Sequence, residues 1–229
     1  MKYSKELKFF TIKSSKPISK RLINMFSKSY LINKKYFPKD PDKFIIFICN
    51  SEEEFRKYAK PYYSKLASAV GLGSKGIATR SPDFVEKIGK YKRTDFQNLM
   101  NHEVSHIFWY QLCKTWSPQW FIEGLACHIG KNFVLSNNEL KKIIKKNNIK
   151  GYILDFRYIR RNFKNGHYLR YSIWQAFIGF IIMEYSLEKI KKFTLQFSKD
   201  QSKDNYNRLF KDLFGKNDKA LFKEFIKNY

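Results

Sequence analysis

The stretch His102-Glu103-Val104-Ser105-His106 contains two histidines four positions apart, with a glutamate directly after the first. On an α-helix, residues i and i+4 lie on one face, so both imidazole rings can bind a single metal ion. Glu103 would then be close enough to act on a water molecule at that ion. The chain has four histidines, and two of them are here. The stretch therefore predicts a helical metal site, with an ordinary surface helix as the alternative.

A catalytic zinc site needs a third protein ligand, and the sequence offers Glu123 for that role. It lies 17 positions after His106 (123 minus 106), within Pro118-Gln119-Trp120-Phe121-Ile122-Glu123-Gly124-Leu125-Ala126. The pair Ser117-Pro118, read as an N-cap and a first-turn proline, permits a tight turn between two roughly antiparallel helices. Gly124 would let the two backbones approach closely at the metal.

The apolar surroundings of Glu123 also favour a metal ligand. A carboxylate buried among apolar side chains needs a positive partner, and a zinc ion would supply one. The alternative is that Glu123 is a partly exposed helix residue with no role in binding. Both interpretations stay open at the level of residue spacing.

The two motifs, in this order, resemble those of the gluzincin metallopeptidases, and most closely the peptidase-MA group, whose pattern is HExxH followed by PxWxxEGxA. The resemblance implies that His102, His106 and Glu123 bind one Zn²⁺ ion and that Glu103 is the general base. It implies a zinc metallopeptidase that hydrolyses a peptide or protein substrate with a zinc-activated water. The GxMEN motif of the aminopeptidase-N-like branch is missing and the gap between the motifs is shorter, so we expect an endopeptidase.

The resemblance also draws attention to the segment His167-Tyr168-Leu169-Arg170-Tyr171, where related peptidases position a tyrosine or histidine over the oxyanion. Tyr171 is our candidate, with Tyr168 and His167 as alternatives. The chain contains 15 tyrosines, so simple packing is an open alternative for each of them. His128 lies five positions after Glu123, roughly 140° around a helix, and we expect it to pack or face solvent.

Residue patterns and the resemblance together predict an α+β, zincin-like fold, forming a single catalytic domain over residues 1–229. Residues 1–93 are expected to form a small lobe of strands and helices with a mixed sheet. Residues 94–229 are expected to form the active-site helix and a mainly helical lobe. In such folds an edge strand pairs with extended peptide substrate, a role that would fall on Ile77–Arg80.

Local patterns place the individual elements. The continuous apolar run Phe44–Cys49 predicts a strand at the centre of the sheet. Ser51 is expected to cap a helix over 52–59, and Thr94 to cap the helix that carries the histidines. The other expected elements are strands at 8–13 and 77–80 and helices at 17–33, 137–147, 168–185, 187–198, 202–213 and 217–228, with 150–165 irregular.

The net charge of +25, from 45 Lys and Arg against 20 Asp and Glu, suggests a second hypothesis. The chain could be a basic module that binds nucleic acid or an anionic membrane, with a structural or empty metal site. However, the lysines are spread from end to end and accompany abundant Asn, Ile, Phe and Tyr, a profile typical of AT-rich coding. We therefore do not expect nucleic acid as a partner.

The number and spacing of the cysteines and the length of the apolar runs indicate the cellular compartment. Cys49, Cys113 and Cys127 are an odd number with no CxxC pair, which favours reduced, buried thiols. The longest apolar run, Ala176–Met183, has eight residues, whereas a membrane span needs about 20. The start Met1–Lys8 has no signal-peptide core. We expect a cytoplasmic protein without a transmembrane segment.

Overall fold

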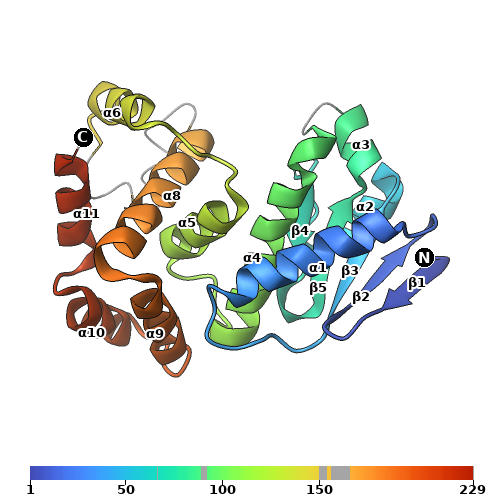
Figure 1. Ribbon diagram of the computed structural model, residues 1–229, viewed down its shortest axis with the longest axis horizontal. Helices are drawn as coiled ribbons and strands as arrows, with labels where there is room; N and C mark the ends of the chain where they lie inside the picture. Colours follow the sequence, from blue (N-terminus) through green and yellow to red (C-terminus); the bar gives the residue numbers. More distant parts are fainter. Residues whose placement is uncertain (66, 89–91, 150–153, 156–165, 229) are drawn as a thin grey trace. The chain divides into compact units, whose positions relative to one another are not determined.

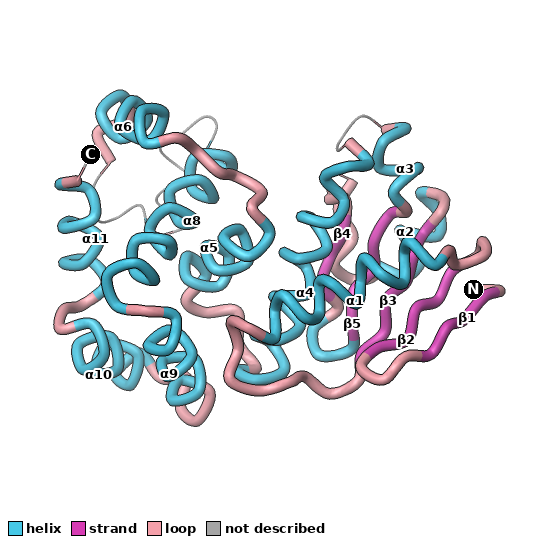
Figure 2. Tube along the Cα trace, viewed as in Figure 1, coloured by secondary structure: helices cyan, strands magenta, loops and turns pink. Residues whose placement is uncertain are grey.

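The computed structural model describes residues 1–65, 67–88, 92–149, 154–155 and 166–228, without the side chains of residues 166–168. Contacts divide the chain into two compact units, Met1–Lys114 and Thr115–Tyr229. The described strands all belong to the first unit, while the second is drawn as helices and loops (Figure 2). The expected α+β class is therefore confirmed, with the described strands and several helices in the first unit and helices in the second.

The first unit contains a five-stranded mixed sheet in the order β1-β2-β3-β5-β4. Its strands are β1 (Tyr3–Glu6), β2 (Phe10–Ser14), β3 (Phe44–Cys49), β4 (Ala69–Gly71) and β5 (Gly76–Arg80). β2, β3 and β5 run parallel, and β1 and β4 pair antiparallel at the two ends. β3 lies in the middle, as its apolar sequence predicts.

The prediction that Ile77–Arg80 is an edge strand is wrong. β5 pairs with β3 on one side and with β4 on the other, and all five of its residues are buried. Its backbone hydrogen-bonding groups are therefore used within the sheet, and it cannot pair with an extended substrate. The sequence reasoning missed β4, a three-residue strand before a glycine-rich turn.

Helices cover both faces of the sheet. On one face, Phe26 of α1 (Lys20–Lys34) lies between Phe10 of β2 and Phe96 of α4 (Phe96–Cys113), and Figure 1 shows α1 crossing in front of the strands. On the other face, α2 (Glu52–Ala59) buries Phe55 and Ala59 against Cys49 and Ala78. These two apolar layers hold the sheet and fix the position of α4.

The first turn of α2 also anchors the end of β5. Ser51 accepts a hydrogen bond from the Glu54 amide and caps the helix, as predicted. Arg80, only 1% exposed, donates two hydrogen bonds to the Glu52 carboxylate and lies over the Phe55 ring at 4.0 Å. This arginine is therefore a structural residue rather than a substrate contact. A short helix, α3 (Pro82–Lys87), follows β5 and was not predicted.

The second unit consists of helices close to those expected. They are α5 (Gln119–Gly130), α6 (Asn137–Lys146), α8 (Gly166–Tyr185), α9 (Leu187–Phe197), α10 (Lys203–Phe214) and α11 (Asp218–Lys227). Their shared core is aromatic, with Phe177, Phe193 and Phe210 all fully buried. The prediction for 150–165 falls mostly outside the described residues. No helix among the described residues combines the length and apolar character that crossing a membrane requires.

Candidate metal centre

The helix that carries the histidine pair starts later than predicted. A 3₁₀ turn, Arg93–Asp95, precedes α4, and Asp95 occupies the N-cap position without a side-chain cap bond. Thr94 is therefore not the N-cap, because it lies within that turn and its hydroxyl donates to the Asp95 carboxylate. The prediction that residues 102–106 lie on a helix is confirmed, since α4 runs on to Cys113.

His102 and His106 present their rings to the same point. Their Nε2 atoms are 3.1 Å apart, and the ring planes cross at 85°. Two ligand atoms 2.0–2.1 Å from a zinc ion at a tetrahedral angle are about 3.3 Å apart. The observed separation is close to that value, so the pair fits a metal ion without rearrangement of the helix.

Burial distinguishes this pair from histidines on a solvated surface. His102 is 9% exposed and His106 is 6% exposed, and Glu103 between them is 7% exposed. A buried carboxylate beside two buried imidazoles is costly unless a cation or hydrogen bonds compensate it. The interpretation of 102–106 as an ordinary surface helix is therefore wrong.

A buried polar network fixes the turn of α4 just before His102. Ser29 of α1 donates to the Asn101 side-chain oxygen at 2.8 Å, and Gln97 donates to both of these residues. Asn33 donates from its amide to the backbone oxygens of Ser29 and Asn101, each at 2.9 Å. The sequence reasoning missed these residues. The sequence did contain a signal for them. Ser29 and Asn33 are polar residues one helical turn apart, on the same face as apolar residues of the helix.

Glu123 lies in α5 in the second unit, where it is partly buried. α5 begins at Gln119, and Pro118 occupies its N-cap position, so the prediction of a Ser117 cap followed by a first-turn proline is wrong by one residue. A β-carbon placed on Gly124 would meet the Trp174 carbonyl oxygen of α8 at 2.8 Å. Within the second unit, Gly124 therefore serves the contact of α5 with α8, a role that the spacing of the motifs could not reveal.

Tyr171 of α8 is close enough to Glu123 to feel its charge. Burial, and then the negative charge of Glu123, raise the pKa of the Tyr171 phenol well above its usual range. The phenol therefore keeps its proton at neutral and moderately alkaline pH and can donate a hydrogen bond. Its ring stacks on Phe133 with the centroids 5.3 Å apart.

Arg170 is the further residue beside this phenol that the sequence reasoning passed over. It is 7% exposed, its guanidinium carbon lies 4.8 Å from the Tyr171 ring centroid, and its Nη2 donates to the phenol oxygen at 3.4 Å. The sequence signal that could have identified it was an arginine among the mostly apolar and aromatic residues of α8. The two alternatives to Tyr171 cannot be compared with it, because the side chains of Tyr168 and His167 lie outside the described residues.

His128 is a packing residue of α5. It lies against Gly179 of α8, where a β-carbon would be 3.6 Å from its Nδ1. Burial, and then the positive charge of Lys131, lower the pKa of its imidazole. The contact with Gly179 agrees with the expectation that His128 packs or faces solvent.

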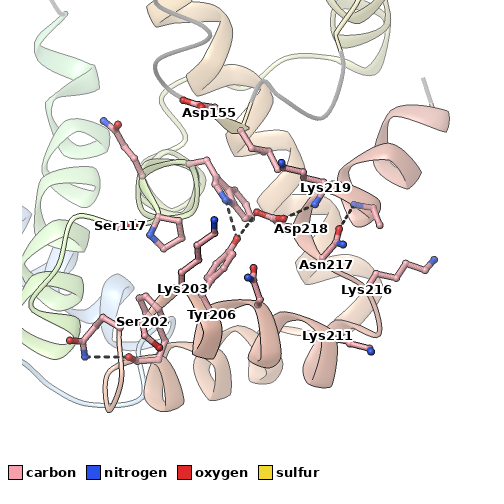
Figure 3. Close-up of a pocket in the computed structure, with 18 of the residues that line it drawn as sticks. Ser117, Asp155, Ser202, Lys203, Tyr206, Lys211, Lys216, Asn217, Asp218 and Lys219 are labelled. Atoms are coloured by element: carbon pink, nitrogen blue, oxygen red, sulfur yellow. Dashed lines mark hydrogen bonds between the residues drawn. The ribbon is translucent and has the colours of Figure 1, made fainter.

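A large cavity of about 1220 Å³ opens where α5, α10 and α11 begin. Inside it, the Tyr206 hydroxyl accepts a hydrogen bond from the Trp120 indole at 3.2 Å and donates one to Asp218 at 2.8 Å (Figure 3). Four lysines are among the residues that line the cavity, namely Lys203, Lys211, Lys216 and Lys219. The start of α5 thus lines this cavity, about one turn before Glu123.

The chemistry of the donor set fits zinc. His102, His106 and Glu123 offer two imidazole nitrogens and one carboxylate oxygen, the combination that catalytic zinc sites use while leaving a position for water. Neither the models of known protein families nor the curated protein sequences give a match to this chain. The case for the site therefore rests on its own residues.

Proposed function

We propose that the protein is a zinc-dependent endopeptidase with a zincin-like arrangement of its active-site helix. The observation that carries the proposal is the buried His102–His106 pair, whose Nε2 atoms are 3.1 Å apart with Glu103 between them. Glu123 would complete the ligand set from α5, because five residues of connection, Lys114–Pro118, are all that separates the two helices. This combination is typical of peptide hydrolysis by a metal-activated water.

The residues around the ion divide the chemistry between them. A zinc ion held there would act as a Lewis acid and make a water molecule nucleophilic at neutral pH. Glu103 would take the proton from that water and return it to the leaving amine. Tyr171, which keeps its proton because of burial and the charge of Glu123, would donate a hydrogen bond to the developing oxyanion. Arg170 would hold the phenol in place for that role.

The experiment combines metal content with turnover. Purified wild type and variants are analysed for bound zinc by elemental analysis, and hydrolysis is measured on casein and on a peptide library. We expect one equivalent of zinc in the wild type, its loss in His102→Ala and weaker retention in Glu123→Ala. Glu103→Gln should keep the zinc but lose hydrolysis by at least about 10²-fold, because it removes the general base.

A matched histidine supplies the control. His128→Gln changes a partly buried histidine in α5 that packs on α8 and should leave the zinc content unchanged. Full turnover by Glu103→Gln would rule out the mechanism, and a wild type without metal would favour the basic binding module instead. That alternative predicts salt-sensitive binding to nucleic acid or anionic vesicles that survives the loss of both histidines.

A further inference from the structure

A cavity of about 210 Å³ lies in the first unit at the end of its sheet. The parallel strands β2, β3 and β5 all end here, and the loops after them lie at one end of the sheet (Figure 1). Ser14, Asn50 and Ser81, from these three strand ends, contribute to its lining. Sheets with parallel strands commonly bind ligands outside the carboxyl ends of their strands.

The floor of the cavity carries buried hydroxyl groups. Ser14 is 3% exposed, and its oxygen accepts hydrogen bonds from the Lys16 amide and the Asn50 side-chain amide. Its own hydrogen is therefore available to donate. Ser81 is 7% exposed, and its hydroxyl makes no hydrogen bond within the described part of the chain. A hydroxyl that lines a cavity and makes no hydrogen bond with the described residues can donate one to a ligand there.

The rim of the cavity is positively charged. Lys16, Arg21 and Arg93 line it with exposed side chains, against one carboxylate, Asp83. Asp83 pairs with Arg93 at 2.9 Å, which neutralises one of the three cations. For Lys16 and Arg21, the described residues provide no ion-pair partner. The cavity thus keeps an excess of two positive charges above its hydroxyl floor.

We propose that this cavity binds the phosphate group of a small phosphorylated molecule. A phosphate offers several strong acceptor oxygens in a tetrahedral arrangement, which matches hydroxyl donors below and cationic donors above. The volume accommodates a phosphate and a short organic part. No aromatic side chain is among the described residues that line the cavity, so it lacks the surface on which a nucleotide base would stack.

The site is independent of the proposed peptidase centre. None of its lining residues is a candidate zinc ligand, and all of them lie in strands, turns, α1 and α3 of the first unit or in the 3₁₀ turn before α4. The site is therefore tested separately, on the full chain in its purified, metal-loaded form.

The test is calorimetric titration with two probes, inorganic phosphate and glycerol phosphate. The wild type should bind at least one of them saturably, and equal affinities would show that the phosphate alone is sufficient. Arg21→Gln removes a charge-assisted contact, so its affinity should fall about tenfold. Ser81→Ala should weaken binding at least about threefold, because it removes one neutral hydrogen bond.

One control variant, and a test variant at an exposed position, keep the result decisive. Arg56→Gln removes an exposed arginine of α2 that does not line the cavity, and it should bind within about twofold of the wild type. Because Arg21 is exposed, Arg21→Gln should fold even if Ser81→Ala does not. The proposal is overturned if neither probe saturates the wild type or if Arg21→Gln binds as well as the wild type. Loss of binding in His102→Ala together with retention in Arg21→Gln would also overturn it, since the phosphate would then be on the metal.

Discussion

At the scale of single residues, the Nε2 atoms of His102 and His106 lie 3.1 Å apart because residues i and i+4 share one face of a helix. The histidine pair could be predicted from its spacing because the i, i+4 rule is local and holds on any helix. Gly124 was correctly singled out but its partner was not, because the backbone that approaches it is 50 positions further along the chain at Trp174 (174 minus 124). Arg170 was missed for a similar reason, since its role depends on burial beside Tyr171.

The tight contact at Gly124 leads to a stability prediction. Gly124→Ala should lower the free energy of unfolding by about 1–3 kcal/mol, because its new methyl group would meet the Trp174 carbonyl oxygen at 2.8 Å and Ile178 at 2.9 Å. Gly179→Ala is the matched control in α8, where the nearest atoms are 3.6 and 3.7 Å away in the His128 ring. It should be neutral or stabilise by up to about 1 kcal/mol through helix propensity. Urea unfolding measures both, and equal effects would contradict the described contact.

At the scale of elements, the sequence predicted the existence of helices and strands better than their neighbours. α2 was predicted to the residue because Ser51 and the three glutamates after it form a local start signal. β5 was recognised as a strand but placed at an edge, because strand order depends on pairing partners that are distant in sequence. α4 groups with the first unit, although the change to helical patterns before it suggested a lobe boundary after residue 93.

The contact of α1 with α4 depends on polar groups as well as on aromatic packing. Asn33 is fully buried, and its amide bonds two backbone oxygens, one on each helix. Removing that amide leaves the Asn101 oxygen with one hydrogen bond fewer in the turn before His102. These hydrogen bonds from α1 therefore hold the histidine pair in its position within the first unit.

We expect Asn33→Ala to lower the free energy of unfolding by about 2 kcal/mol, since two buried hydrogen bonds are lost at about 1 kcal/mol each. Asn24→Ala, an exposed position in the same helix, should change it by less than about 0.5 kcal/mol. Chemical denaturation of both variants measures the difference. A loss in Asn33→Ala no larger than in Asn24→Ala would show that the network does not stabilise the first unit.

At the scale of the whole molecule, the protein keeps several weak acids buried in their neutral form. All three cysteines are buried and none forms a disulfide in the described part of the chain. Burial raises the pKa of both the Cys49 and the Cys113 thiols to about 12. Burial, and then the charge of Asp218, raise the pKa of the Tyr206 phenol well above its usual range. Folding is thus linked to proton binding in both units.

Stability should therefore decline in alkali. Because the folded-state pKa of each thiol is raised above the unfolded value of about 8.5, its contribution is complete below that pH and is lost as the pH rises towards 12. Each thiol adds a slope of up to about 1.4 kcal/mol per pH unit. Unfolding by urea at a series of pH values should show a shallower decline for Cys49→Ala than for the wild type. Identical slopes would mean that Cys49 ionises in the folded protein.

The order of the strands determines how readily the sheets of two copies of this protein could pair edge to edge. β1 and β4 are the two outer strands, so they carry the unpaired backbone groups of the sheet. β1 exposes Ser4, Lys5 and Glu6, and β4 is only three residues long. Charged or very short outer strands are poor templates for a strand from another chain. The long apolar strands lie between them, so the sheet is protected against aggregation at both of its edges.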